Sequence, residues 1–244
     1  MSASRELLAR VNGLISLEPE DLGAATGTAG WLHRLCRAAG RELVASGVAL
    51  SVMTEAGSWG MAACSDPASG VVEELQFTLG EGPCLDAFTS RRPVLAPDLV
   101  GDGTTRWPGY SQAAQGLGVR AVFAFPLQVG GARLGALDVY REQSGVLTTA
   151  GLAQALTFAE VATTALLDGQ EQAGAGRTPA GLDDVLESGA TLHQAQGMVM
   201  VQLGVSLAEA MARLRAHAFA QDRSLADVAR AIVARKLSLE RDET

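Results

Sequence analysis

Three predicted helices within residues 190–235 constrain the fold more than any other feature of this sequence. Ser206 and Glu209 fit a capping box in front of one apolar run, and Ser224 and Asp227 repeat the arrangement in front of the next. These two boundaries divide the segment into three helices that are expected to pack as a small bundle.

The apolar residues of this segment recur at helical spacing and predict its buried positions. The positions are Val185, Leu192, Val199 and Leu203 in the first helix, Leu207, Ala210, Met211, Leu214 and Ala218 in the second, and Leu225, Val228, Ala229 and Ile232 in the third. The first helix is also apolar on its opposite side, at Met198 and Val201. It therefore needs a second cover, either a partner chain or the N-terminal domain.

The outer faces of the second helix carry two pairs of notable residues. Arg213 and His217 share one shoulder of this helix, and Arg215 and Phe219 share the other. Arginine beside an exposed aromatic ring suits the recognition of unstacked RNA bases and phosphates. A bundle with an ordinary solvated face would present the same residues.

The order Ala195-x-Gly197, Ala210, Leu214, Ala218, Val228-Ala229 and Ile232 resembles the ANTAR family of RNA-binding antiterminator domains. The resemblance implies binding to paired RNA hairpins with short loops, which prevents a transcription terminator from forming. Gln194 and Gln196 stand where the family often has basic residues, so they can hydrogen-bond a base edge but bring no charge. The candidate RNA-binding residues are His193, Gln194, Gln196, Gly197, Met200, Arg213, Arg215 and His217.

The first of these helices offers one shoulder for close approach of RNA. His193, Gly197 and Met200 share it, and a glycine lets another backbone come near. Two structural alternatives remain open at this stage: the shoulder could serve helix packing, and Gln196 could be a satisfied interior amide.

Charge is unevenly distributed along the 244 residues. The whole chain has a net charge of −8, whereas residues 190–236 hold six basic and three acidic residues, a local charge of +3. This balance predicts modest, salt-sensitive phosphate binding.

Several classes of protein are disfavoured by the composition. We expect no transmembrane helix and no signal peptide, hence a cytoplasmic location. Cys36, Cys64 and Cys84 are odd in number and lack metal-ligand spacing, which argues against a disulfide framework and a zinc site. His33 and the other two histidines form no triad or metal set, and no cofactor is indicated.

The N-terminal part alternates between helical and strand-like patterns. Helices are predicted at 4–17, at about 31–46 and at about 149–169, the last burying Leu152 and Leu156 among others. Strands are predicted at 48–53 and 59–64 and at 119–129 and 132–140, with a Gly130-Gly131 turn in the second hairpin. Residues 93–98 form at best a short edge strand, and Pro83 begins a helix in an otherwise irregular middle.

The patterns Phe125-Pro126-Leu127 and Leu134-Gly135-Ala136-Leu137 resemble a GAF sensor domain over roughly residues 26–170. The run LGEGPCLDA, residues 79–87, resembles the version often joined to ANTAR domains. The resemblance implies a small-molecule sensor, a redox sensor or a dimer scaffold, with Cys84, Asp98 and Asp102 as candidate ligand-binding residues. Cys84 could be an activated thiol at a helix start or a small core residue.

The predicted fold class is α+β: a GAF-like antiparallel sheet flanked by helices, followed by a small three-helix ANTAR bundle. The predicted domains are an N-terminal segment (1–25), the GAF-like domain (26–170), a linker (171–181), the ANTAR domain (182–238) and a tail (239–244). We predict a homodimeric, non-enzymatic antitermination regulator that binds paired hairpin RNA and, through the GAF domain, a small ligand. A three-helix DNA-binding regulator and a thiol-dependent reductase using Cys64 and Cys84 are the alternatives.

Overall fold

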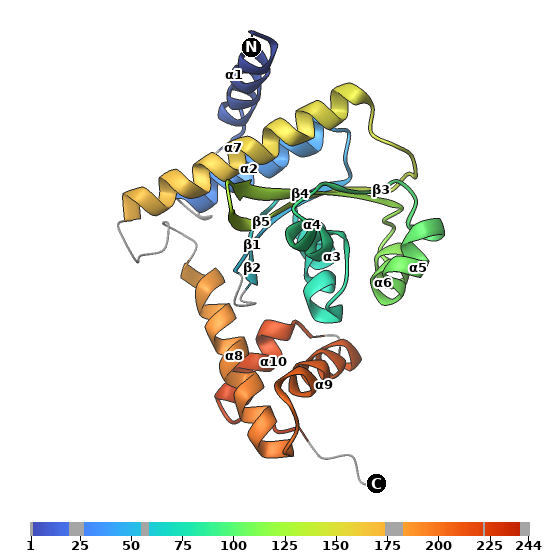
Figure 1. The fold of residues 1–244 in the computed structure, drawn as a ribbon, viewed down its shortest axis with the longest axis vertical. Helices are drawn as coiled ribbons and strands as arrows, with labels where there is room; N and C mark the ends of the chain where they lie inside the picture. The colour runs from blue at the N-terminus through green and yellow to red at the C-terminus, as the bar shows by residue number, and fades with distance from the viewer. Residues whose placement is uncertain (1, 20–26, 55–58, 174–182, 222, 240–244) are drawn as a thin grey trace.

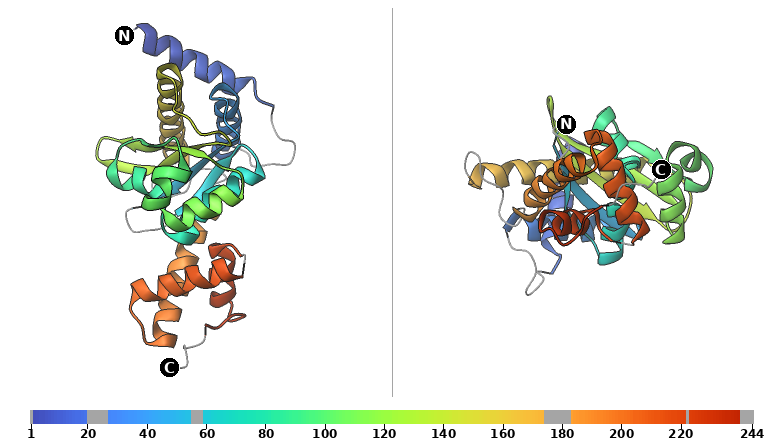
Figure 2. Two further views of the ribbon diagram at one scale, coloured as in Figure 1. Left: turned by 90° about the vertical axis from the view of Figure 1, so that its right-hand side faces the viewer. Right: turned by 90° about the horizontal axis from the view of Figure 1, so that it is seen from below.

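The computed structural model describes residues 2–19, 27–54, 59–173, 183–221 and 223–239. A five-stranded antiparallel sheet has helices on both faces, and a separate helical unit lies at one end of the molecule (Figure 1). The two units are stacked along the long axis, so that the two chain ends lie at opposite ends of the molecule (Figure 2). The predicted fold class is confirmed.

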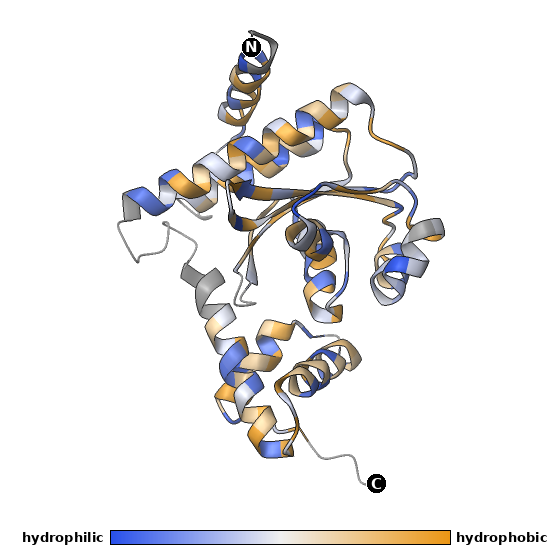
Figure 3. Cartoon of the chain, in the orientation of Figure 1, coloured by the Kyte–Doolittle hydropathy of each residue, from blue (hydrophilic) through white to orange (hydrophobic). Residues whose placement is uncertain are grey.

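The sheet has the strand order β2-β1-β5-β4-β3. Its strands are β1 (Gly47–Met53), β2 (Trp59–Cys64), β3 (Val94–Ala96), β4 (Ala121–Val129) and β5 (Ala132–Arg141). Both predicted hairpins form, and Gly130 has the positive φ, 54°, that its turn requires. The short strand β3 lies at the edge, as predicted. The central strands carry mainly hydrophobic residues (Figure 3).

One face of the sheet is covered by α2 (Gly27–Glu42) and α7 (Thr149–Ala173), with α1 (Ser2–Ser16) packed across them (Figure 1). By length and composition alone, residues Thr149–Glu171 of α7 could cross a membrane. Phe158 and Ala162 of this helix are nevertheless fully buried in the core of the sheet domain, as in the core helix of a globular domain. Leu156 is 44% exposed because it lies on the outer side of the helix, so its predicted burial is wrong.

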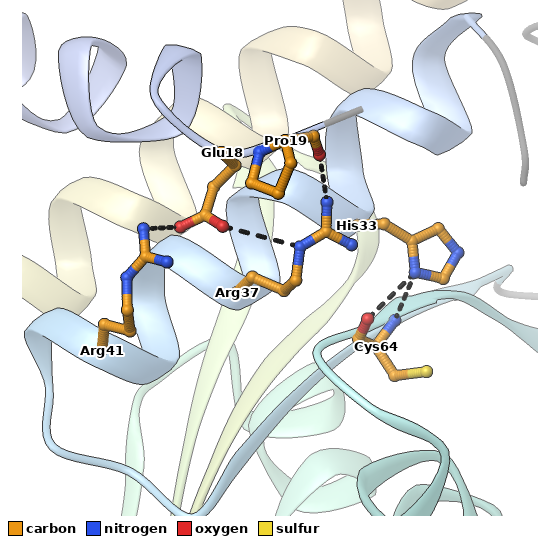
Figure 4. Close-up of polar contacts among 6 residues, drawn as sticks. All are labelled: Glu18, Pro19, His33, Arg37, Arg41 and Cys64. Atoms are coloured by element: carbon orange, nitrogen blue, oxygen red, sulfur yellow. Dashed lines mark hydrogen bonds and ion pairs between the residues drawn. The ribbon is translucent and has the colours of Figure 1, made fainter. Parts of the chain in front are cut away.

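The end of α1 is fixed to α2 by a nearly buried carboxylate (Figure 4). Glu18 forms ion pairs with Arg41 and Arg37, and Arg37 also donates to the Pro19 carbonyl at 2.8 Å. One turn earlier on α2, the His33 ring lies 2.9 Å from the Cys64 carbonyl oxygen. These contacts tie the N-terminal helix and strand β2 to the same helix.

The other face of the sheet is covered by short helices: α3 (Pro67–Leu79), α4 (Pro83–Ser90), η1 (Leu99–Gly103), α5 (Thr104–Arg106) and α6 (Pro108–Gly116). The sequence predicts an irregular middle before the helix at Pro83, and α3 shows that this prediction is wrong. Asp66 caps α3 by accepting from the Ser69 amide at 3.0 Å, Pro67 occupies its first turn, and Gly80 ends it with φ 74°. These three residues are the ordinary start and stop signals of a helix.

The C-terminal unit consists of α8 (Asp183–Leu203), α9 (Leu207–Ala220) and α10 (Leu225–Val233). Both predicted caps are confirmed: Ser206 accepts from the Glu209 amide at 3.2 Å, and Ser224 accepts from the Asp227 amide at 2.9 Å. Most predicted core positions are buried, but Leu207 is 52% exposed because it opens α9 beside the loop. The Val185 side chain lies outside the described residues.

The two units touch directly: α8 lies beside β2, and α9 lies beside α3. Trp59 of β2 stacks on Phe77 of α3, with ring centroids 3.7 Å apart, and also packs against the core of the C-terminal unit. The N-terminal domain therefore covers α8 on the side of Leu192. Val201 on the opposite side is 75% exposed, so the N-terminal domain does not supply the second cover expected there.

Candidate functional site

The solvent-facing side of α8 brings together three of the predicted RNA-binding residues. His193 and Gln194 are exposed, and a Cβ added at Gly197 would meet no atom within 4 Å. Beside them is a hollow of about 620 Å³. It is lined by Gln194, Gly197, Met198, Val201, Gln202, Ile232, Arg235, Leu237 and Ser238.

The hollow includes a residue that the sequence did not single out. Arg235 follows α10 in the left-handed region, with φ 58°, and is exposed. The sequence shows that Arg235 adds to the local positive charge. It does not show that Arg235 lines the same hollow as Gln194, because that depends on how α10 packs against α8. A polar, partly apolar hollow with one guanidinium suits a splayed nucleotide.

Other predicted residues make contacts within the C-terminal unit. Gln196 donates to the Leu207 carbonyl at 2.8 Å and so links α8 to the start of α9. Met200 is half-buried against the core of the unit. On α9, Arg213 forms an ion pair with Glu209 at 3.1 Å, and His217 lies half-buried one turn farther along.

Arg215 lies apart from these residues, on the shoulder of α9 that faces the N-terminal domain. A Cβ added at Gly80, the C-cap of α3, would lie 2.3 Å from Nη1 of Arg215. Burial lowers the pKa of Arg215, and among the described residues its Nε has no hydrogen-bond partner. The guanidinium is therefore covered by the end of α3 in this arrangement.

A second contact joins the two units at the start of α10. The Ser224 hydroxyl and the Leu225 amide donate to the Glu74 carboxylate of α3. Burial, and then the charge of Asp227, raise the pKa of Glu74. A cavity of about 240 Å³ lies between the units here, with Trp59 among its lining residues.

The three predicted GAF ligand residues do not share one environment. Asp98 is exposed and caps η1 by accepting from the Val100 amide at 3.0 Å. The Asp102 side chain lies outside the described residues. Cys84, by contrast, is fully buried in the first turn of α4.

Cys84 belongs to a buried polar cluster that the sequence did not indicate. Its thiol donates to Oε1 of Glu73 at 3.3 Å, and Gln76 joins Glu73 to Asp138 through contacts of 3.0 and 2.7 Å. The Tyr140 hydroxyl also donates to Glu73. Glu73 and Gln76 could not be recognised as cluster residues, because helix α3 is not predicted from the sequence. Asp138 was recognisable, because a single carboxylate within the apolar strand β5 indicates a buried polar site.

The cluster does not provide an activated thiol. Burial, and then the charges of Asp138 and Glu73, raise the pKa of Cys84, which opposes the lowering expected at a helix start. Cys64 is half-buried on β2 and Cys36 lies in the core, and all three thiols are free. This environment disfavours the reading of Cys84 as a redox sensor and gives the reductase alternative no support.

Two family models match this chain. The GAF domain model matches residues 29–167, and the ANTAR domain model matches residues 180–233. No curated protein gives a sequence match.

Solved structures show the same sheet domain. The GAF domain of a phosphoenolpyruvate-protein phosphotransferase from Coxiella burnetii is similar with a TM-score of 0.51 and 15% identity, over 69% of this chain and 95% of that one. The corresponding domain from Acinetobacter has a TM-score of 0.50 and 13% identity, over 68% of this chain and 94% of that one. A free methionine-R-sulfoxide reductase from Neisseria meningitidis has a TM-score of 0.46 and 15% identity, over 68% of this chain and 92% of that one.

The GAF match covers more than half of the chain, and the ANTAR match covers the helical unit after it. The chain therefore belongs to the GAF domain family and carries a C-terminal ANTAR domain, the architecture of a sensor joined to a regulatory effector.

Proposed function

We propose that this chain is an RNA-binding transcription antitermination regulator. Its ANTAR domain binds the loops of paired RNA hairpins through the outer face of α8. The observation that carries the proposal is the hollow beside Gly197, where the backbone is open to solvent and Gln194 and Arg235 flank it. An unstacked loop base enters the hollow while the guanidinium meets a phosphate.

Arg213 and His217 of α9 and His193 of α8 do not line this hollow and provide further contacts to the RNA. Arg213 is held on α9 by Glu209, which fixes the direction of its side chain. Arg215 joins the surface only when α3 moves away from α9. In the arrangement described here, the protein is in a restrained state with part of its basic surface covered.

The GAF domain serves as the sensor or as the dimerisation module, and the regulator is a cytoplasmic homodimer. Support for a dimer surface comes from α7, whose Leu156 is exposed, and from a groove of about 470 Å³ beside it that includes Leu8 and Trp31. Two ANTAR domains in one dimer bind two hairpin loops, because the second binding event gains from a raised effective concentration.

The test is a titration of the purified full chain with three nucleic acids at two salt concentrations. The probes are a paired-hairpin RNA with short loops, the same hairpins with scrambled loops, and duplex DNA of equal length. The proposal expects selective binding of the intact loops. Equal binding of all three would leave only a weak polyanion surface, and preference for the duplex would favour the alternative of a DNA-binding regulator.

Gly197→Gln fills the hollow without touching the core, because a side chain at this position meets open space. We expect this variant to lose about ten-fold or more in loop affinity, the scale of one lost base contact. Gly13→Gln is the matched control, since it is also a helical glycine with open space, on α1. Equal affinities of both variants and the unmodified chain would place RNA elsewhere.

A further inference from the structure

Three metal-ligating side chains converge inside the GAF domain from three different elements. A carboxylate oxygen of Glu73 from α3, Sγ of Cys84 from α4 and a carboxylate oxygen of Asp138 from β5 all lie within 4.8 Å of one another. All three residues are fully buried. Their positions along the chain give no metal signature, because the ligands meet only after the sheet and both helices have formed.

Two unpartnered polar atoms at the same place point to a ligand. Oδ1 of Asp138 and the hydroxyl of Tyr110 have no hydrogen-bond partner among the described residues, and both side chains are fully buried. Burial, followed by the charges of Asp138, Glu73 and Cys84, raises the pKa of Tyr110, so its phenol lies within electrostatic range of the cluster. Buried polar atoms are rarely left without a partner, so each such atom needs an explanation such as an ion or a water.

The charge of the cluster also favours a cation. No Lys, Arg or His forms an ion pair with Glu73 or Asp138 in the described part of the chain. Two carboxyl groups and a thiol at one buried site can ionise together only if a positive charge neutralises them.

We propose that Glu73, Cys84 and Asp138 bind a divalent first-row transition metal. One thiolate and two carboxylates form a mixed soft and hard set that suits Zn²⁺ or Fe²⁺, whereas Mg²⁺ and Ca²⁺ prefer oxygen ligands alone. On binding, the Cys84 thiol and the Asp138 carboxyl each transfer a proton to solvent, and Sγ and a carboxylate oxygen form bonds to the metal.

The cavity between the two domains borders helix α3 next to this site. Glu73 is one of the residues that line this cavity of about 240 Å³, together with Glu74 and Ser224. Gln76 supports the ligands from outside, since its amide donates to both Glu73 and Asp138.

The experiment is a metal titration of the full-length chain after treatment with a chelator. Zn²⁺ binding is measured by equilibrium dialysis with elemental analysis, and Co²⁺ serves as a spectroscopic substitute. The proposal expects one Zn²⁺ per chain and, with Co²⁺, the charge-transfer absorption of a metal-bound thiolate. Cys84→Ser and Asp138→Asn should each weaken Zn²⁺ binding about 100-fold, while Cys64→Ser should leave it unchanged.

A second variant keeps the test decisive if the buried substitutions prevent folding. The chain has three cysteines, so a Cys36→Ala/Cys64→Ala double variant leaves Cys84 as its sole thiol. A thiolate–cobalt band that persists in this variant assigns the metal to Cys84. Absence of stoichiometric metal in the folded unmodified chain would overturn the proposal, as would loss of the band in the double variant or unchanged affinity in folded Cys84→Ser. The cluster would then be a hydrogen-bonded carboxyl pair.

Discussion

Gly135 of strand β5 pairs with Val52 of strand β1 and lies close to the Ser51 backbone. A Cβ at this position would be 1.8 Å from the Ser51 carbonyl oxygen, a distance that no side chain can occupy. The two strands would have to separate, and the sheet hydrogen bonds between them would lengthen. The need for glycine here follows from the backbone approach and not from a turn, because φ is not positive at this residue.

We therefore expect Gly135→Ala to lower the free energy of unfolding by about 3 kcal/mol, the upper range for forcing atoms into a packed core. Gly131→Ala is the control, since a Cβ there meets no atom within 4 Å. Urea denaturation followed by circular dichroism measures both. Equal midpoints for the two variants would mean that the strands can separate at little cost.

The position of a side chain could be predicted from the sequence only where neighbouring residues in the chain determine it. The caps Ser206 and Ser224 follow from spacing, and both form. Glu73 and Arg215 could not be placed, because their surroundings depend on contacts between α3 and elements far away in sequence. The pKa of Cys84 shows the same limit: the helix start is local and predicts a lowered value, but non-local burial dominates.

Helix α3, which the sequence does not predict, carries Glu73 of the buried cluster and covers Arg215 of α9. Asp66 caps it with one carboxylate oxygen on the Ser69 amide and the other on the Ser69 hydroxyl. We expect Asp66→Ala to lower the free energy of unfolding by about 1–2 kcal/mol at neutral pH, the usual value of an N-cap. Asp66→Asn, which keeps an acceptor oxygen, should lose less. Equal losses would show that charge, and not hydrogen bonding, stabilises the cap.

The same cap predicts a dependence on pH. Burial alone raises the pKa of Asp66, but hydrogen bonds from Ser65, Ser69 and the backbone outweigh it and lower the pKa overall. A lowered folded-state pKa means that the stabilisation is full above the unfolded value of about 4 and is lost as the pH falls through the folded value. The difference between the unmodified chain and Asp66→Ala should therefore shrink below about pH 4. A constant difference in acid denaturation would contradict this.

The ion pairs that Glu18 forms with α2 allow a prediction about α1, a helix that the sequence does predict. Glu18 is 3% exposed, and neutralising it breaks its ion pairs with Arg37 and Arg41. We expect Glu18→Gln to cost about 2 kcal/mol, as for a buried hydrogen bond to a charged group. Arg10→Gln breaks the solvent-exposed pair with Glu42 and should cost less than about 1 kcal/mol. Thermal unfolding of both variants distinguishes a structural clamp from a surface ion pair.

Helices and strands could be predicted from the sequence where the apolar residues keep one spacing throughout, or where turn residues such as Gly130-Gly131 separate two strands. The two hairpins and α7 have such patterns. Helix α3 lacks a clear apolar stripe because Glu73 and Gln76 occupy buried positions, so the period that identifies a helix is interrupted by the cluster itself. The interruption of the pattern therefore coincides with the candidate metal site.

At the scale of the whole molecule, α3 connects the two proposed sites. Glu73 faces the buried cluster, while its neighbour Glu74 reaches the start of α10, and the end of the helix covers Arg215. Trp59 reinforces the contact from β2 by stacking on Phe77 and packing against the ANTAR core. A displacement of α3 would therefore change the exposure of the ANTAR domain.

Removing the Trp59 side chain should release this contact without changing any charge. If the arrangement in which the domains touch keeps Arg215 from RNA, Trp59→Ala raises the affinity for the paired-loop RNA by about ten-fold, because the released guanidinium adds one charge-assisted contact. Leu95→Ala removes an exposed apolar side chain from the edge strand β3, away from the domain contact, and should leave the affinity unchanged. Filter binding at two salt concentrations measures both variants.

Arg215 provides the internal check, because the two arrangements assign it different roles. While α3 covers the guanidinium, Arg215→Ala removes no contact with RNA, so its effect in the unmodified chain should be small. In the Trp59→Ala background the side chain is released, and the same substitution should cost about 1–3 kcal/mol of binding free energy, as for a charge-assisted hydrogen bond. The difference between the two backgrounds is a coupling energy that a double-mutant cycle measures directly. A coupling of zero would mean that the domain contact is structural and that Arg215 faces α3 whether or not RNA is bound.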